Sequence, residues 1–312
     1  MSSQSPPSAA PSAVRLPAHR TAEREQSVAA FGAIYLIWGS TYLAIRYGVA
    51  TIPPYLMTGV RCLIAGGLLY GWSRWRGSSR PAGRAWLAAI GVGSLLFVVG
   101  QGVLSWAETR VPSGPAALLV ATIPLWMVLV DWARRGGRAP AARVWLGIAV
   151  GLSGVLLLTV PGGGAAGVDP LGAVAILLAA ISWSVGSFWA RSPSLPESRT
   201  QSAGMQLLAA GAVLVVIAAA IGEPSGFDPR EVSGRSLAAL AYLILFGSVV
   251  AFSAYIWLLD HSTPARIGSH AYVNPIIAVL LGVAAGDGAF SGWIVLATAA
   301  VVGAVMLTME EI

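Results

Sequence analysis

The chain has 312 residues, of which 56% are hydrophobic and only 10% are charged, and its mean hydropathy is +0.74. Soluble domains carry about 25% charged residues, so this composition excludes an ordinary soluble domain and places most of the chain in lipid. The net charge is +6 and all 19 basic residues are arginine. Such an excess could indicate nucleic-acid binding, but the position of the arginines between apolar segments favours residues that orient membrane spans. The single cysteine, Cys62, supports neither a disulfide framework nor a metal site, and we expect no cofactor.

The N-terminal segment, residues 1–27, contains many Ser, Pro and Ala residues with scattered Arg, which predicts a disordered tail and not a cleaved signal peptide. Ten apolar segments follow it, each of about 20 residues, the length that crosses about 30 Å of hydrocarbon. The predicted spans are residues 28–47, 55–73, 85–107, 113–131, 142–160, 170–190, 200–221, 236–259, 264–285 and 290–309.

The arginines predict how these spans are oriented. With a cytoplasmic N-terminus, fourteen arginines fall on the cytoplasmic side and four on the outer side, while Arg61 lies within the second span. Cytoplasmic loops of membrane proteins carry an excess of basic residues. We therefore expect both termini to be cytoplasmic.

The two halves of the chain resemble each other. A shift of 151 positions places Pro124 on Pro275, each near the middle of an apolar segment. Each half, 28–161 and 168–309, contains five predicted spans, so the second half must enter the membrane in the opposite orientation. The sequence therefore predicts two inverted five-helix repeats around a central cavity, with a helix break at each of the two prolines. A duplication without transport, as in a membrane scaffold or sensor, is the alternative.

Aromatic residues line one face of the first span. Phe31, Tyr35, Trp38 and Tyr42 are spaced by four, three and four residues, which is one side of a helix. Trp38 lies near the predicted midplane, and a shift of 145 residues places it on Trp183. Tryptophans are typical of membrane interfaces, so a midplane pair indicates either the wall of a cavity or plain helix packing. Under the first interpretation Trp38, Tyr42 and Trp183 contact a substrate.

Three polar residues are expected near the outer ends of the second and third spans. Arg61 lies at a depth where an ionisable group usually faces the bundle interior, Gln101 lies at a similar depth, and Glu108 lies at the rim. This cluster could hold a substrate carboxylate or form an outer gate. A structural ion pair, or an arginine that reaches the outer surface, is the alternative.

The ninth span carries a polar stripe that the fourth span lacks. Arg266, His270 and Asn274 are four residues apart, and Asn274 adjoins Pro275. We expect Asn274 and His270 to line the cavity; His270 could carry a proton or simply hydrogen-bond to a neighbour. None of the thirteen carboxylates lies near a predicted midplane. Tight coupling to protons or sodium often uses such a group, so we expect weak coupling.

Four strings and one pair of related strings stand out, namely WGSTYLAIRYG (38–48), PPYLMTGVRCLIAGG (53–67), VPSGPAALLVATIPLW (111–126), AYVNPIIAVLLG (271–282) and the pair GVLLLT and GAVMLT. As a set they resemble the drug/metabolite transporter superfamily, specifically its EamA-like exporters with ten spans. The resemblance implies a bacterial inner-membrane exporter of small molecules, and a nearly uncharged aromatic cavity suits amphipathic metabolites, amino acids above all. The expected partners are such a substrate and the lipid bilayer, without nucleic acid. A multidrug exporter of the same fold remains open, whereas no zinc-ligand pair, nucleophile elbow or close carboxylate pair supports an enzyme.

Overall fold

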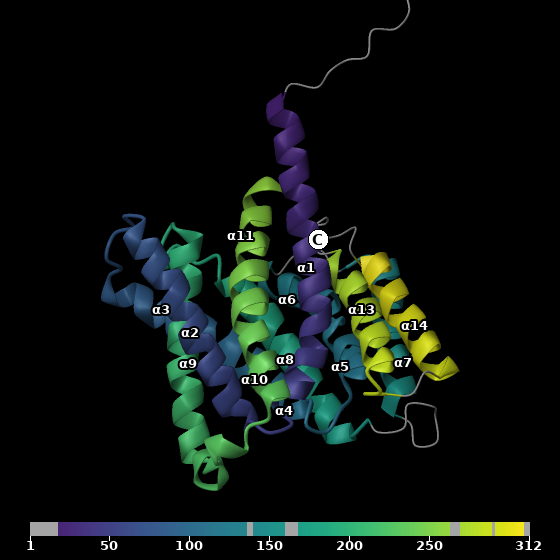
Figure 1. The fold of residues 1–312 in the computed structure, drawn as a ribbon. Helices are drawn as coiled ribbons and strands as arrows, with labels where there is room; N and C mark the ends of the chain where they lie inside the picture. Colours follow the sequence, from purple (N-terminus) through teal and green to yellow (C-terminus); the bar gives the residue numbers. More distant parts are fainter. Residues whose placement is uncertain (1–17, 136–139, 160–167, 263–268, 289–290, 309–312) are drawn as a thin grey trace, which may run out of the picture.

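The computed structural model describes residues 18–135, 140–159, 168–262, 269–288 and 291–308, and within these ranges every regular element is a helix (Figure 1). The first half contains α1 Ala18–Gly48, α2 Pro54–Trp75, α3 Gly83–Gly93, the π-helix η1 Ser94–Gly102, α4 Val103–Ala107, α5 Ser113–Val120, α6 Ile123–Arg135 and α7 Ala142–Thr159. The second half contains α8 Pro170–Trp189, α9 Arg199–Ala220, the 3-10 turns η2 Glu223–Gly226 and η3 Pro229–Glu231, α10 Gly234–Tyr242, the π-helix η4 Leu243–Val250, α11 Ala251–His261, α13 His270–Ala284 and α14 Gly292–Thr308.

Several of these helices are long and apolar enough to cross a membrane. Within the described residues there are six, at Glu25–Gly48, Gly83–Ala107, Ser113–Arg134, Pro170–Trp189, Arg199–Ala220 and Gly234–Tyr255. Three further apolar helices are shorter, at Ala142–Leu157, His270–Ala284 and Gly292–Leu307. The part of the chain that the structure describes is thus all-helical, and its apolar helices support a multi-pass membrane protein. Length and composition alone identify fewer spans than the ten predicted.

The first helix begins earlier than the sequence predicts. Residues 18–27 were expected to belong to a disordered tail, but they form the first turns of α1, because AHRTAEREQ is rich in strong helix formers. With 31 residues, α1 is about 46 Å long, which exceeds the hydrocarbon thickness. Its N-terminal turns therefore project beyond the other helices in Figure 1.

Helices α2 and α9 pack along their whole length, and glycines bring their backbones together (Figure 1). A Cβ on Gly66 would lie 2.6 Å from the backbone nitrogen of Leu208, and a Cβ on Gly204 would lie 2.6 Å from that of Tyr70. Small residues permit this close approach between membrane helices. Because the partners of later residues in α2 come earlier in α9, the two helices run antiparallel.

Helices α7 and α14 form a second close pair with the same geometry. A Cβ on Gly151 would lie 3.1 Å from the Ala304 Cβ, and one on Gly154 would lie 3.0 Å from the Ala300 Cβ. The order of these contacts again indicates antiparallel helices. In contrast, α1 packs on α13 in parallel: its residues Tyr35, Gly39 and Arg46 meet successively later residues, Ser269, Asn274 and Asp287.

The two prolines that the sequence equates behave differently. A two-residue interruption, Ala121–Thr122, separates α5 from α6, and the Thr122 hydroxyl donates to the Leu119 carbonyl at 2.6 Å. Pro124 follows as the second residue of α6, where its missing N–H has no intrahelical partner to lose. In contrast, α13 is one helix that runs through Pro275, so the break predicted there is absent. A single lost hydrogen bond one turn from the helix start does not interrupt it.

The irregularity that occurs at equivalent places in both halves of the chain is a π-helical segment. The π-helix η1 interrupts the third predicted span and η4 interrupts the eighth. From Ser94 to Leu243 is a shift of 149 residues, the same shift that aligns Gly154 with Gly303. Short π-helical segments occur often at functional sites because they displace side chains and leave carbonyls off the regular ladder.

Candidate functional site

A buried polar centre connects α1, α2 and the two π-helical segments. The Arg61 side chain on α2 is only 8% exposed. Its Nε donates to the Ser248 hydroxyl of η4 at 2.8 Å, and Nη1 reaches Gln101 Oε1 of η1 at 3.5 Å. One residue before Ser248, the Gly247 carbonyl accepts the indole N–H of Trp38 at 3.2 Å. Arg61, Gln101 and Trp38 thus belong to one connected centre.

Six aromatic rings continue from this centre through the bundle. Each ring contacts the next with centroid separations of 5.2 to 6.2 Å, in the order His270, Trp38, Tyr255, Phe252, Phe97 and Trp183. The structure therefore brings the two predicted tryptophans into one aromatic series, but they do not touch each other. Trp183 packs over Gly100, where a Cβ would approach its ring to 3.1 Å.

Glu108, the residue after α4, is the most unusual polar group of the described chain. Its side chain is completely buried, and neither carboxylate oxygen has a hydrogen-bond partner within the described residues. Burial raises the pKa of Glu108 well above its usual range, and Asp287 raises it further, whereas Arg46 and Arg61 lower it. Of the three residues expected to form a cluster, the structure joins Arg61 to Gln101, and within the described residues it shows no salt bridge between Arg61 and Glu108.

An ion-pair network closes the end of the bundle around Glu108, which we call the Asp287 end. Arg46, near the end of α1, donates from Nε to Asp287 Oδ1 at 2.9 Å, and its Nη1 donates to the main-chain carbonyl of Glu108. The other oxygen of Asp287 accepts the backbone N–H of Ser113 at 2.9 Å. This carboxylate therefore binds the N-terminus of α5, where a negative charge is favourable. The contacts join α1, α5 and the turn after α13.

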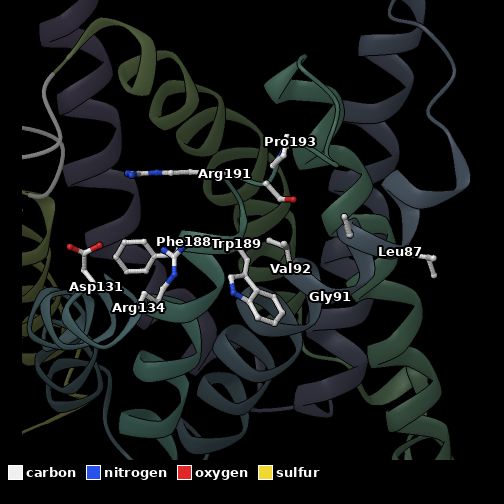
Figure 2. Close-up of a pocket in the computed structure, with 11 residues that line it drawn as sticks. Leu87, Gly91, Val92, Asp131, Arg134, Phe188, Trp189, Arg191 and Pro193 are labelled. Carbon is white, nitrogen blue, oxygen red and sulfur yellow. The ribbon is translucent and has the colours of Figure 1, made fainter. Parts of the chain in front are cut away.

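The opposite end of the bundle, which we call the Arg191 end, contains a cavity of about 670 Å³ (Figure 2). It lies between α3, α6 and the C-terminal end of α8, and this volume is in the range of small-molecule sites. Its lining consists of Leu87, Ala88, Gly91, Val92, Asp131, Arg134, Phe188, Trp189, Arg191, Ser192 and Pro193. The Arg134 guanidinium lies 5.0 Å from the centre of the Phe188 ring, and in Figure 2 the Arg191 side chain extends above this pair. Apolar, aromatic, cationic and anionic groups thus meet in one opening.

None of the predicted site residues lines this cavity. Trp183 lies six residues before Trp189 on α8, about 9 Å deeper along the helix. Asn274 on α13 is 5% exposed, and its Oδ1 has no hydrogen-bond partner in the described part of the chain. Tyr42 lies close enough to Glu108 for the two to interact electrostatically. Arg266, which the predicted polar stripe includes, lies outside the described residues.

Sequence reasoning missed the pair formed by Arg46 and Asp287. Only their distance in space, not their spacing in the chain, identifies them as partners. The two π-helical segments were missed as well. A possible signal was the run of apolar residues around Gly100 and Gly247, but apolar composition does not distinguish a π-helix from an α-helix.

Comparison with known proteins identifies the family of this chain. The model of the EamA-like transporter family matches residues 28–160 and, a second time, residues 170–309. The chain is 42% identical over 276 residues to YedA of Escherichia coli strain K12, described as an uncharacterized inner membrane transporter, and the match covers 88% of each protein. It is 28% identical to the protein PecM of Dickeya dadantii strain 3937, over 79% of this chain and 80% of PecM. A solved crystal structure with 25% sequence identity superposes with a TM-score of 0.61 and covers 91% of this chain and 96% of the other.

Proposed function

Because the chain belongs to the EamA-like transporter family, a family of membrane transporters, we propose that it exports small amphipathic metabolites across the inner membrane by alternating access. Amino acids are the substrate class that we favour. The observation that carries the proposal is the difference between the two ends of the bundle. Arg46, Asp287 and Ser113 close one end, whereas a cavity opens at the other between α3, α6 and α8. This is the arrangement expected of an inward-facing carrier.

The packing of equivalent helices supports two inverted repeats, one in residues 28–161 and one in 168–309. The second helices of the two halves, α2 and α9, lie side by side and antiparallel, and so do the fifth helices, α7 and α14. A twofold axis within the membrane plane produces this relation. Together with the excess of arginine near the Arg191 end, it supports a cytoplasmic position for that end and for both termini.

The chemistry of the cavity supports an amphipathic substrate that carries a carboxylate. Arg134 and Arg191 supply guanidinium groups, which bind carboxylates, and Phe188 and Trp189 supply apolar surface. A substrate that enters between α3 and α8 would next meet Trp183 and the aromatic series. The deeper part of the route then consists of Trp38, Tyr42, Gln101, His270 and Asn274. It opens toward the outside once Arg46 and Asp287 separate.

Flux through proteoliposomes that contain only this protein tests the proposal. We expect labelled amphipathic amino acids to exchange across the membrane, with saturation and with competition by unlabelled substrate. Exchange of cationic or neutral drugs alone would favour a multidrug exporter of the same fold. Absence of flux for every class, in protein that remains folded, would contradict transport and favour a scaffold or sensor. Chemical conversion of a supplied compound would instead indicate an enzyme.

Arg191→Gln gives a sharper test of the cavity. If Arg191 binds a substrate carboxylate, its loss removes one charge-assisted hydrogen bond, so the substrate concentration for half-maximal flux should rise about tenfold. Arg84→Gln, an exposed arginine at the same end that does not line the cavity, is the matched control and should leave flux unchanged. Equal effects of the two substitutions would show that only surface charge matters.

A further inference from the structure

The carboxylate of Glu108 combines complete burial with the absence of any hydrogen-bond donor within the described residues. An ionised carboxylate is strongly disfavoured away from water unless donors or a cation compensate it, whereas burial of the neutral acid costs much less. This geometry therefore fits a protonated Glu108. The site is also positioned to sense closure, because the main-chain carbonyl of the same residue accepts a hydrogen bond from Arg46.

The charged groups around Glu108 explain why nothing neutralises it in this conformation. From α1 it meets Tyr42 and Arg46, from α2 Arg61, and from the turn after α13 Asp287. Arg46 is paired with Asp287, and Arg61 donates to Ser248 and Gln101. At the start of α8, which packs against α4, Asp169 is paired with Arg110 at 3.2 Å. Both nearby cations are thus engaged with other groups, and Asp287 adds a like charge.

We propose that Glu108 is a proton-binding site that locks the Asp287 end: closure transfers one proton from the outer solution to its carboxylate, and reopening returns the proton to the same side. On closure an O–H bond forms on the carboxylate while Arg46 pairs with Asp287. On opening, Asp287 separates, the proton leaves to outer water, and Arg46 becomes available to the ionised Glu108. The inference rests on the alternating access proposed above.

The direction of the pH dependence follows from this exchange. In an open, hydrated conformation Glu108 would keep the ordinary pKa of a glutamate, whereas burial in the closed conformation raises its pKa. The closed conformation is therefore favoured most below the ordinary value. The ratio of closed to open protein falls about tenfold per pH unit as the pH rises toward the raised pKa of Glu108, and the ratio stays constant above that pKa. Because the proton enters and leaves on one side, the lock changes the rate of transport without driving accumulation.

Infrared difference spectroscopy can detect the proton directly. At neutral pH the wild-type protein in detergent should show the C=O absorption of a protonated carboxyl group, and Glu108→Gln should lose it. Glu231→Gln, which removes an exposed carboxylate, is the matched control and should retain the band. A wild-type spectrum without such a band, or a band that survives Glu108→Gln, would overturn the proposal.

Hydrogen exchange of the segments 108–113 and 284–288 tests the lock itself. As the pH is raised, wild-type exchange corrected for intrinsic chemistry should accelerate with the same midpoint as the loss of the infrared band. Glu108→Gln, which cannot ionise, should stay protected throughout. Wild-type protection that does not change with pH would refute the lock, even if the band is present. Neither measurement needs a substrate, so a failed flux assay leaves both results interpretable, and the wild-type titration needs no variant.

Discussion

The ion pair between Arg46 and Asp287 should hold the closed end of the transporter together, and Asp287→Asn is the substitution that tests it. The asparagine keeps the shape of the side chain and can still accept the backbone N–H of Ser113, but it removes the charge that attracts Arg46. The closed conformation should therefore lose stability relative to the open one, while the helices themselves remain intact.

The structure bounds the size of this effect. A hydrogen bond to a charged group contributes about 1.5–3 kcal/mol, whereas an exposed ion pair contributes about 0–1 kcal/mol. The side chain of Asp287 is 12% exposed and that of Arg46 is 33% exposed, so the pair lies between these cases. We expect a loss of about 1–2 kcal/mol, which is a five- to thirtyfold shift toward the open conformation.

A double-mutant cycle with hydrogen exchange as the readout measures this quantity. Exchange of residues 108–113 should accelerate in Asp287→Asn and in Arg46→Gln, and the double variant should show less than the sum of the two effects. Asp169→Asn provides a control, because it breaks the more exposed pair with Arg110 at the same end. Strictly additive effects, or equal acceleration in the control, would refute the assignment of this pair as the closing contact.

Two further predictions concern the interior. Trp38→Phe loses the hydrogen bond to the Gly247 carbonyl and should lower the free energy of unfolding by about 1 kcal/mol, while Trp38→Ala should lower it by about 3–5 kcal/mol. Trp75, which is 75% exposed, should tolerate the same changes. Thermal unfolding in detergent measures both effects. Gly66→Ala should destabilise the α2–α9 contact by about 1–3 kcal/mol, because its Cβ meets backbone at 2.6 Å. Gly67→Ala, with nothing within 4 Å, should be neutral or stabilising, and equal effects at the two glycines would contradict the packing argument.

The sequence predicted the helical membrane fold and the family because those depend on local composition. The long apolar segments and the family strings can be recognised whatever the detailed packing of the helices is, and both halves match the same family. The extent of α1 was wrong because helix propensity continues into a charged segment that composition alone marks as a tail. The prediction of a break at Pro275 was wrong because a proline near the start of a helix removes only one backbone hydrogen bond, and this loss does not end the helix.

The candidate site was harder to predict because it depends on contacts between distant segments. The aromatic series joins Trp38 to Trp183 only through Tyr255, Phe252 and Phe97, whose positions in the sequence give no reason to group them. The roles of Trp38, Gln101, His270 and Asn274 in substrate binding stay predictions. Their depth in the bundle supports those roles, but the cavity of the present conformation ends before it reaches them.

The sequence revealed neither the two π-helical segments nor the Glu108 carboxylate that lacks a partner among the described residues, and both features favour the same mechanism. The π-helical segments place Gln101, Gly247 and Ser248 around Arg61, so this cation is satisfied without a carboxylate. Because Arg61 bonds to these groups, the Glu108 carboxylate has no guanidinium partner within the described residues. Under the proposal, this is the condition for Glu108 to bind a proton when the Asp287 end closes. The absence of a midplane carboxylate predicted weak coupling, and the proposed proton site at the Asp287 end is consistent with it. Such a site responds to the pH of one side only, so external pH should set the rate of the cycle while a pH gradient provides little driving force.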